Sequence, residues 1–282
     1  MDHRPRLERL LIGLRGLGLL RSWPLGDPDD AERQLAAIVE MLAHREAPPM
    51  NEALELREYD HADGYAAWSE TYDEPGNALI DVEERALRPI LASLPVGDAA
   101  DVACGTGRLS AILCELGHRV IGIDPSEEML DRARAKHLPA TFRLGSFESL
   151  PLADDSADLV TCALALTHST ELRFVAEEFC RVLRPGGAVV TTDIHPITVA
   201  TGGAQALFRR ADGSRGVTVN YQHWISDYVR AFVDAGFVIE RCEEPVVDDG
   251  FKNGLGSDDV REAADLGLTG LPLLLIWVLR AP

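Results

Sequence analysis

The stretch Asp101-Val102-Ala103-Cys104-Gly105-Thr106-Gly107 decides the fold of this chain. It ends an apolar run that begins at Ala99 and comes just before a helical pattern, which predicts a turn from a strand into a helix. The two glycines permit a sharp turn and a close approach of the backbone to a ligand. The amides at the start of the next helix suit a carboxylate or a phosphate. The stretch therefore predicts a ligand-binding turn.

Short apolar runs alternate with amphipathic segments after this turn, which is typical of a parallel sheet built from β-α-β units. The expected strands are Ala99–Cys104, Arg119–Asp124, Thr141–Leu144, Asp158–Ala163, Ala188–Ile194, Phe237–Glu243 and Leu273–Leu279. The expected helices lie around residues 108–116, 126–137, 171–183 and 225–235. Gly117 and Gly236 mark helix ends, and Ser126 marks a helix start. The pattern predicts an α/β fold.

Residues 1–50 show helical spacing and no strand signal. Two short helices are expected there, the second after Asp27-Pro28, where an N-cap residue precedes proline at the first helical position. A fourth helix is expected over about residues 79–94.

A third helical stretch carries Tyr65, Trp68 and Tyr72 at spacings i, i+3 and i+7, which places three aromatic rings on one stripe. Such a stripe either packs a core or faces a ligand. Further along, Asp212-Gly213 separates two runs that are expected to pair as a hairpin. We therefore divide the chain into an N-terminal helical lid over residues 1–95 and a ligand-binding domain over residues 96–282, with an insertion at about residues 196–224.

The charge balance argues against two classes of partner. Lys and Arg total 27 and Asp and Glu total 46, which gives a net charge of 27 − 46 = −19. Nucleic acid and acidic membrane surfaces both favour clustered basic residues, so neither is an expected partner. The five cysteines have neither disulfide-scaffold nor zinc-site spacing, which predicts a reduced, cytoplasmic protein without a metal site.

An acid at the end of the second strand indicates the ligand. Asp124 follows Gly105 by 19 residues, close to the offset of about 20 at which such an acid reaches a ribose diol. Turn and acid together predict an adenosine-bearing cofactor. Ser110 stands where the third glycine of a dinucleotide fingerprint is expected, which weakens a dinucleotide interpretation.

At this point the sequence resembles the class I S-adenosylmethionine (SAM)-dependent methyltransferases, especially the branch like the ubiquinone and menaquinone biosynthetic enzymes. The resemblance covers about residues 60–195. It depends on an ordered set of stretches: Tyr72-Asp73, Asp101 to Gly107, Ile123-Asp124-Pro125-Ser126 with Met129-Leu130, Gly145 to Pro151, Asp158-Leu159-Val160-Thr161, and Arg181 to Gly187.

The resemblance implies a Rossmann-like fold with a mostly parallel, seven-stranded sheet in the order 3-2-1-4-5-7-6, helices on both faces and an antiparallel last strand. It implies that the methionine part of SAM meets the Gly105–Gly107 backbone, that Asp124 holds the ribose hydroxyls and that Met129 packs beside adenine. The implied cofactor-binding residues are Tyr72, Asp101, Ala103, Gly105, Gly107, Asp124, Pro125, Met129, Ser146, Phe147, Glu148, Ala163 and His168.

The chain departs from the family pattern at two places in this set. Ser146-Phe147 stands where the family usually has an aspartate followed by a small residue, so Ser146 or Glu148 is expected to replace that contact. Ala103 stands where the first glycine of the family's loop is usual.

Methyl transfer from a sulfonium is an in-line displacement, so positioning and water exclusion supply much of the catalysis. A base is needed when the acceptor carries a proton of high pKa. His168 and His195 both follow a strand at the ligand-binding edge, and we hypothesise that one of them is the general base. The alternative is that His168 shapes the cofactor floor and that His195 only turns the chain.

The candidate acceptor-binding residues are Tyr65, Trp68, Arg209, Tyr221 and His223. We expect a SAM-dependent methyltransferase acting at O, N or C of a small organic acceptor, such as an intermediate of secondary metabolism, with S-adenosylhomocysteine as the other product. Two alternatives stay open: a SAM-binding cyclase, pericyclic catalyst or inactive partner subunit, and a nicotinamide-dependent oxidoreductase. Whether the chain forms a homodimer also stays open.

Overall fold

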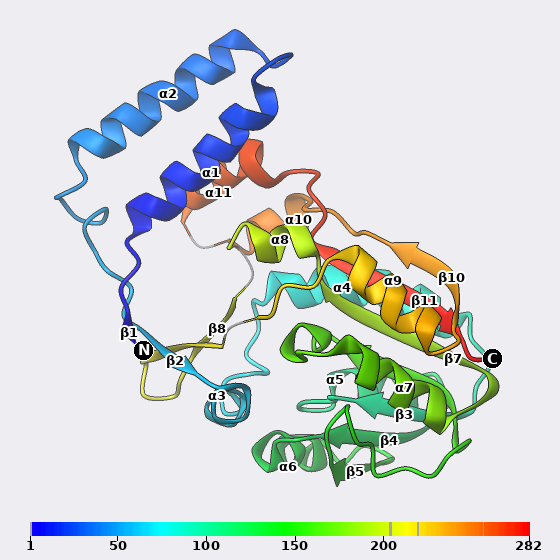
Figure 1. The fold of residues 1–282 in the computed structure, drawn as a ribbon. Helices are drawn as coiled ribbons and strands as arrows, with labels where there is room; N and C mark the ends of the chain where they lie inside the picture. The colour runs from blue at the N-terminus through cyan, green and yellow to red at the C-terminus, as the bar shows by residue number, and fades with distance from the viewer. Residues whose placement is uncertain (1, 203–204, 219, 256) are drawn as a thin grey trace. The chain divides into compact units, whose positions relative to one another are not determined.

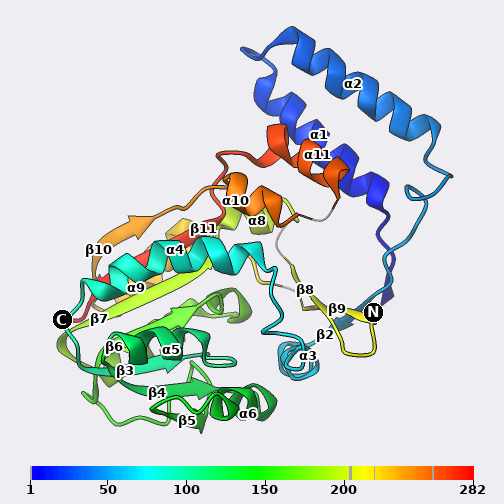
Figure 2. The same ribbon diagram turned by 180° about the vertical axis from the view of Figure 1, so that it is seen from behind.

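The computed structural model describes residues 2–202, 205–218, 220–255 and 257–282. Its contacts divide the chain into two compact units. The first unit comprises Met1–Glu58, Pro75–Val82 and Val246–Leu271. The second comprises Tyr59–Glu74, Glu83–Pro245 and Pro272–Pro282. Figures 1 and 2 show the ribbon from opposite sides.

A seven-stranded sheet forms the centre of the second unit. Its strands in chain order are β3 (Asp98–Val102), β4 (Arg119–Asp124), β5 (Ala140–Leu144), β6 (Ala157–Ala163), β7 (Leu183–Ile194), β10 (Val238–Glu243) and β11 (Leu274–Arg280). The spatial order β5-β4-β3-β6-β7-β11-β10 is 3-2-1-4-5-7-6 when the strands are numbered along the chain. β11 runs antiparallel to both of its neighbours. The predicted order and the antiparallel last strand are confirmed.

Helices cover both faces of this sheet, as predicted (Figures 1 and 2). On one face, α7 (Leu172–Val182) and α9 (Ile225–Asp234) bury residues such as Phe179 and Phe232 against β6, β7 and β11. On the other face, α4 (Ala78–Ala92) and α5 (Arg108–Glu115) bury residues such as Leu91 and Leu113. Because both faces are covered, the strands are almost continuously apolar. The ends of the strands are therefore left for polar side chains.

Local capping signals explain where the helices begin and end. Asp27 caps α2 (Pro28–Ala43) by accepting from the amide of Asp29, and Pro28 is the first helical residue, as predicted. Ser126 caps α6 (Glu127–Ala135) through the amide of Met129. Gly117 has a φ of +92° after α5, which is the left-handed conformation expected of a helix-ending glycine.

The segments that surround the carboxyl edge of the sheet are short. In the insertion, α8 (Pro196–Ala200) precedes the predicted hairpin, which consists of β8 (Ala206–Arg209) and β9 (Arg215–Thr218). The 3-10 turn η1 (Leu166–His168) follows β6. Upstream of the sheet, α3 (His61–Trp68) carries Tyr65 and Trp68 but ends before Tyr72, so the predicted helical stripe is wrong at its last member.

The first unit is mainly helical. It contains α1 (Leu7–Ser22), α2, α10 (Asp249–Asn253) and α11 (Asp258–Leu268), and a short strand β1 (Asp2–His3) pairs with β2 (Leu56–Tyr59). α1 packs closely on α11, where a Cβ on Gly267 would lie 2.5 Å from the carbonyl oxygen of Leu14. The buried Arg15 donates to Gln34 of α2 and forms an ion pair with Glu262 of α11. The helices α10 and α11 were not anticipated from the sequence.

None of the helices within the described ranges combines the length and the apolar character needed to span a bilayer.

Candidate active site

The glycine turn leaves the carboxyl end of β3 with three residues in the left-handed region. Ala103, Gly105 and Gly107 have φ angles of +52°, +53° and +78°. A Cβ built on Gly105 meets no atom within 4 Å, whereas one on Gly107 would lie 3.2 Å from Ala133. Gly105 thus leaves open space above the backbone, and Gly107 allows the turn to pack on α6. Ala103 adopts a conformation that disfavours a side chain.

Asp124 ends β4 directly beside this turn. Its Oδ2 accepts from the amide of Gly105 at 2.8 Å, and its Oδ1 accepts from the amide of Ser126 at 2.9 Å. The side chain is almost completely buried. Burial raises the pKa of Asp124 to about 6, and the two backbone hydrogen bonds oppose that rise. Each carboxylate oxygen has a further lone-pair direction for a ligand hydroxyl.

Asp101 lies beneath the turn and is already paired. Its carboxylate accepts from the hydroxyl of Ser110 at 2.6 Å and from that of Thr161 at 2.9 Å. Burial raises the pKa of Asp101 to about 6, and these two hydrogen bonds oppose the shift. Asp101 therefore connects β3 to α5 and β6. Ser110, which departs from the dinucleotide fingerprint, has a defined structural role here.

The residues predicted at the adenine end differ in exposure. Pro125 and Glu148 are exposed, and Ser146 and Phe147 are half-buried. Met129 has no exposed surface, so contact with adenine would require its side chain to be uncovered. Their roles toward a cofactor stay predictions. Ala163, at the end of β6, is half-buried and packs against the core beneath the edge of the sheet.

The segment before α4 is tied to the glycine turn by polar contacts that the sequence did not reveal. Thr106 donates to Asp73 Oδ1 at 2.6 Å, and the ammonium of Lys136 lies 2.8 Å from Asp73 Oδ2. Lys136 also donates to Thr106 Oγ1 at 3.1 Å. Tyr72 precedes this clamp, and burial raises its pKa to about 12. The clamp fixes the segment that carries the aromatic stripe.

A second network connects α4, α5 and β7. The fully buried Glu83 accepts hydrogen bonds from Arg108 and from the hydroxyl of Thr192. Arg108 also pairs with Glu84 at 3.3 Å. These charges are far apart in sequence, and no motif marks them. Arg108, which lies next to the glycine turn, is thus already neutralised by two carboxylates.

His168 lies at the end of η1, where the prediction placed a candidate base. The hydroxyl of Tyr65 lies 2.6 Å from His168 Nε2, while Nδ1 is buried and has no hydrogen-bond partner among the described residues. Burial, together with the neighbouring His61, lowers the pKa of His168 to about 3. The pKa of Tyr65 is raised well above its usual value, mainly by burial. Both side chains are therefore neutral at physiological pH.

His195 lies at the end of β7 in a different environment. Its Nδ1 accepts from the amide of Ile197 at 3.2 Å, and its Nε2 lies 3.0 Å from Glu244 Oε1. Since both ring nitrogens are engaged, the imidazole caps α8 and holds it to the segment after β10. This geometry leaves no free lone pair on the ring, so His195 is not our candidate for the general base.

The acceptor-binding candidates fall into two groups. Trp68 stacks on Phe208 with ring centroids 5.5 Å apart, and Tyr221 lies 5.6 Å from His61. These two belong to the same aromatic surroundings as Tyr65. Arg209 is exposed, and its carbonyl accepts from Thr71. His223 is buried and bonds to the carbonyl of Ser169, so its ring supports the loop after η1.

Asp193 is a buried acid that the sequence analysis did not single out. It has no exposed surface and accepts from the hydroxyl of Tyr228 at 2.7 Å and from the amide of Ile194 at 2.8 Å. Burial raises its pKa to about 7. The sequence signal that could have identified Asp193 is a lone aspartate at the end of an apolar strand. Asp193 is the third buried carboxylate along the carboxyl edge, after Asp101 and Asp124.

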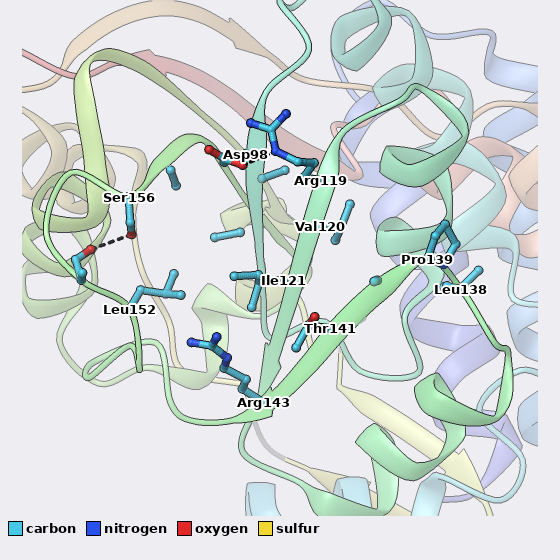
Figure 3. A pocket seen from close by; sticks show the side chains of 15 residues that line it. Asp98, Arg119, Val120, Ile121, Leu138, Pro139, Thr141, Arg143, Leu152 and Ser156 are labelled. Atoms are coloured by element: carbon cyan, nitrogen blue, oxygen red, sulfur yellow. Dashed lines mark hydrogen bonds and ion pairs between the residues drawn. The ribbon is translucent and has the colours of Figure 1, made fainter.

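A pocket of about 670 Å³ lies elsewhere on the sheet, beside the amino-terminal halves of β3, β4 and β5 (Figure 3). Asp98, Arg119, Arg143 and Leu152 are among the residues that line it. None of the predicted site residues lines it. The polar groups suited to a nucleotide converge instead on the carboxyl edge, so the candidate active site lies there.

The fold and this edge define a Rossmann-like protein with a site for an adenosine-bearing ligand. Residues 100–191 match the family model described as "Methyltransferase domain". A malonyl-[acyl-carrier protein] O-methyltransferase from Yersinia pestis is 32% identical over 174 residues, which cover 60% of this chain and 61% of that relative. A ubiquinone/menaquinone biosynthesis C-methyltransferase from Rubrivivax gelatinosus is 39% identical over 88 residues, covering 31% of this chain and 35% of the relative.

Among solved structures, an S-adenosylmethionine-dependent methyltransferase from Mesorhizobium loti matches with a TM-score of 0.55 and 27% identity. The match covers 71% of this chain and 97% of that one. Over this part of its length the chain is similar to class I SAM-dependent methyltransferases, in agreement with the resemblance. It spans about three-fifths of the length of the first curated relative, so activity and substrate are matters for proposal.

Proposed function

We propose that this protein is a SAM-dependent methyltransferase that transfers the sulfonium methyl group to O, N or C of a small organic acceptor. The observation that carries the proposal is the pairing of Asp124 with the open glycine turn. A buried carboxylate at the end of the second strand, hydrogen-bonded to the amide of Gly105, is the arrangement that suits a ribose diol. The similarity to SAM-dependent methyltransferases supports the same cofactor.

The residues present fit SAM. Gly105 has open space where a side chain would otherwise stand, so the methionine part can approach the backbone. The oxygens of Asp124 keep lone-pair directions for the ribose hydroxyls. Bound SAM supplies an electrophilic methyl group on sulfur. The protein's own contribution is to hold the acceptor in line with that methyl group and to exclude water.

His168 is our candidate for the group that receives the acceptor proton. The imidazole is neutral, because burial lowers its pKa to about 3, and a neutral ring has one nitrogen lone pair. Such a ring is a weak base. An acceptor hydroxyl becomes strongly acidic as its oxygen gains the methyl group, so a weak base suffices late in the transfer.

The remaining partners are proposed on sequence and family grounds. The net charge of −19 favours a small-molecule acceptor over nucleic acid or an acidic membrane. The five cysteines are free, which suits a reducing cytoplasmic compartment. A homodimer is compatible with the chain and is readily checked by light scattering with and without residues 1–50.

Calorimetric titration with SAM, S-adenosylhomocysteine and NADH tests the proposed function. We expect both sulfur nucleotides to bind at micromolar concentration and NADH not to bind. Asp124→Ala is expected to abolish this binding, and Asp158→Ala, which removes a carboxylate paired with Arg184 away from the glycine turn, is the matched control. NADH binding alone would favour an oxidoreductase, and no binding by any of the three would contradict the proposal.

A further inference from the structure

The side chains around His168 form a cluster that extends beyond its two members in the implied cofactor-binding set, Tyr72 and His168. Tyr65 contacts His168 edge-on with ring centroids 5.2 Å apart, and the ring centroids of His61 and His168 are 4.5 Å apart. Trp68 and Tyr72 extend the cluster from Tyr65, with centroids 5.7 and 6.4 Å away. These rings come from α3, from the segment after it and from η1. The cluster therefore belongs to the carboxyl edge of the sheet.

One buried polar atom in this cluster, His168 Nδ1, has no hydrogen-bond partner among the described residues. The side chain of the adjacent Thr167 is also buried, and it hydrogen-bonds to Asp193. Buried polar groups are normally paired, and an unpaired one calls for an explanation such as a ligand contact. His168 Nδ1 therefore indicates a place where a ligand supplies the missing partner.

The charges near the cluster favour a neutral acceptor over an anionic one. The aromatic and histidine side chains named above present planar faces, and His168 and the tyrosines are neutral. Two cations lie at the glycine turn, but Arg108 is paired with Glu83 and Glu84, and Lys136 with Asp73. Asp124 and Asp193 both act on Tyr65 electrostatically. An anionic acceptor would meet carboxylates and already-paired cations here.

From these observations we propose that the cluster of His61, Tyr65, Trp68, Tyr72 and His168 is the acceptor subsite and that it takes a neutral, planar, hydroxyl-bearing molecule of the phenol class. The planar ring lies against the aromatic side chains, and the hydroxyl hydrogen-bonds to His168 Nδ1. This inference rests on the proposed function and names its acceptor class.

Tyr65 is a positioning residue in this arrangement. When the proton of the neutral imidazole lies on Nε2 and is shared with the oxygen of Tyr65, the lone pair lies on Nδ1. The acceptor oxygen then bonds to the methyl carbon as the carbon–sulfur bond breaks, and that electron pair stays on sulfur. The hydroxyl proton passes to Nδ1, and the resulting imidazolium releases it to water.

Two probes with the same bicyclic ring test the acceptor class. In the presence of saturating S-adenosylhomocysteine, 2-naphthol and 2-naphthoate are titrated into the full-length protein and followed by tryptophan fluorescence and calorimetry. We expect 2-naphthol to bind at least tenfold more tightly than 2-naphthoate. Equal binding of both, tighter binding of the carboxylate, or no binding of 2-naphthol to protein that binds S-adenosylhomocysteine would overturn the inference and leave the proposed function intact.

Variants test the role of the two named side chains. His168→Gln and Tyr65→Phe are each expected to weaken 2-naphthol binding about fivefold, the amount that a typical hydrogen bond contributes. The affinity for S-adenosylhomocysteine should stay within twofold, and the exposed His44→Gln is the control. Tyr65→Phe keeps the ring and so serves if the His168 variant does not fold. Unchanged 2-naphthol affinity in Tyr65→Phe would contradict the assigned role of Tyr65, and loss of S-adenosylhomocysteine binding would contradict the separation of the two subsites.

Discussion

The ends of β6 and β7 carry the same sequence feature and differ in structure. Each strand is followed by a histidine at the edge where ligands bind. At the end of β6, one ring nitrogen of His168 lies against the hydroxyl of Tyr65, and the other has no partner in the part of the chain that the structure describes. At the end of β7, both nitrogens of His195 are engaged, by Ile197 and by Glu244. Position at a strand end therefore selects candidate bases, whereas the partners of the ring nitrogens decide which histidine has a free lone pair.

Of the changes considered, replacing His168 should have the largest effect, and that effect should be on kcat. His168→Ala is expected to lower kcat for methylation of 2-naphthol by about 10²-fold, the lower end of the range for general-base catalysis, because the ring is a weak base. The affinity for SAM should stay within twofold. Formation of S-adenosylhomocysteine at saturating SAM gives the rate. A wild-type rate in this variant would remove the functional difference between the two histidines.

Asp193, two residues before His195, offers a pH-dependent test of the β7 end. Burial raises its pKa from 3.8 to about 7, so the folded protein holds a proton that the unfolded chain releases. The stabilising contribution of Asp193 is therefore complete below about pH 4 and is lost as the pH rises to about 7. Asp193→Asn should flatten the fall in unfolding free energy across that window.

Urea denaturation at about pH 5 and about pH 8 measures this difference. Asp101 and Asp124 shift in the same direction as Asp193 but remain in both proteins, so the comparison of variant with wild type isolates Asp193. Identical pH dependence in the two proteins would show that Asp193 is ionised throughout.

His195 should affect stability and leave the chemistry alone. His195→Ala removes the cap of α8 and the contact with Glu244, and is expected to cost about 1–2 kcal/mol of unfolding free energy. The rate of methylation and the affinity for SAM should stay within twofold. Glu244→Gln keeps an acceptor for the ring and should cost less. A large loss of kcat with unchanged stability in His195→Ala would reverse our assignment of the two histidines.

The smallest expected effect concerns the glycine turn that follows β3. Ala103 has a φ of +52°, where glycine is favoured. Ala103→Gly is expected to raise the unfolding free energy by about 0.5 kcal/mol, since relief of strain exceeds the added entropy of the unfolded chain. Thermal denaturation measures the change. A loss of stability would mean that the Ala103 side chain contributes packing that outweighs its strain.

The sheet was predictable because its signals are local. The apolar runs, the caps at Asp27 and Ser126 and the glycine after α5 each lie within a few residues of the element they define. The strand order was implied by the resemblance, and the structure confirms it. The residues Gly105 and Asp124 were found because their spacing is a known motif, and the structure brings them within 2.8 Å.

The parts that escaped prediction depend on contacts between distant residues. No helix was predicted between the strands Phe237–Glu243 and Leu273–Leu279, yet α11 buries Ala263, Ala264 and Gly267 against the N-terminal helices. Ser257 and the two aspartates after it were the overlooked helix-start signal. No pattern in the sequence pairs Glu83 with Arg108 or Tyr65 with His168, since those pairs are 25 and 103 residues apart. Their chemistry became evident only in three dimensions.

The most direct test of the central claim follows the methyl group itself. The protein is incubated with SAM that carries a ¹³C-labelled methyl group, together with 2-naphthol, and the products are identified by mass spectrometry. We predict S-adenosylhomocysteine and a naphthol derivative that carries one labelled methyl group, with little of that product from His168→Ala. Consumption of neither compound by protein that binds SAM, or a product without the label, would contradict methyl transfer at this site.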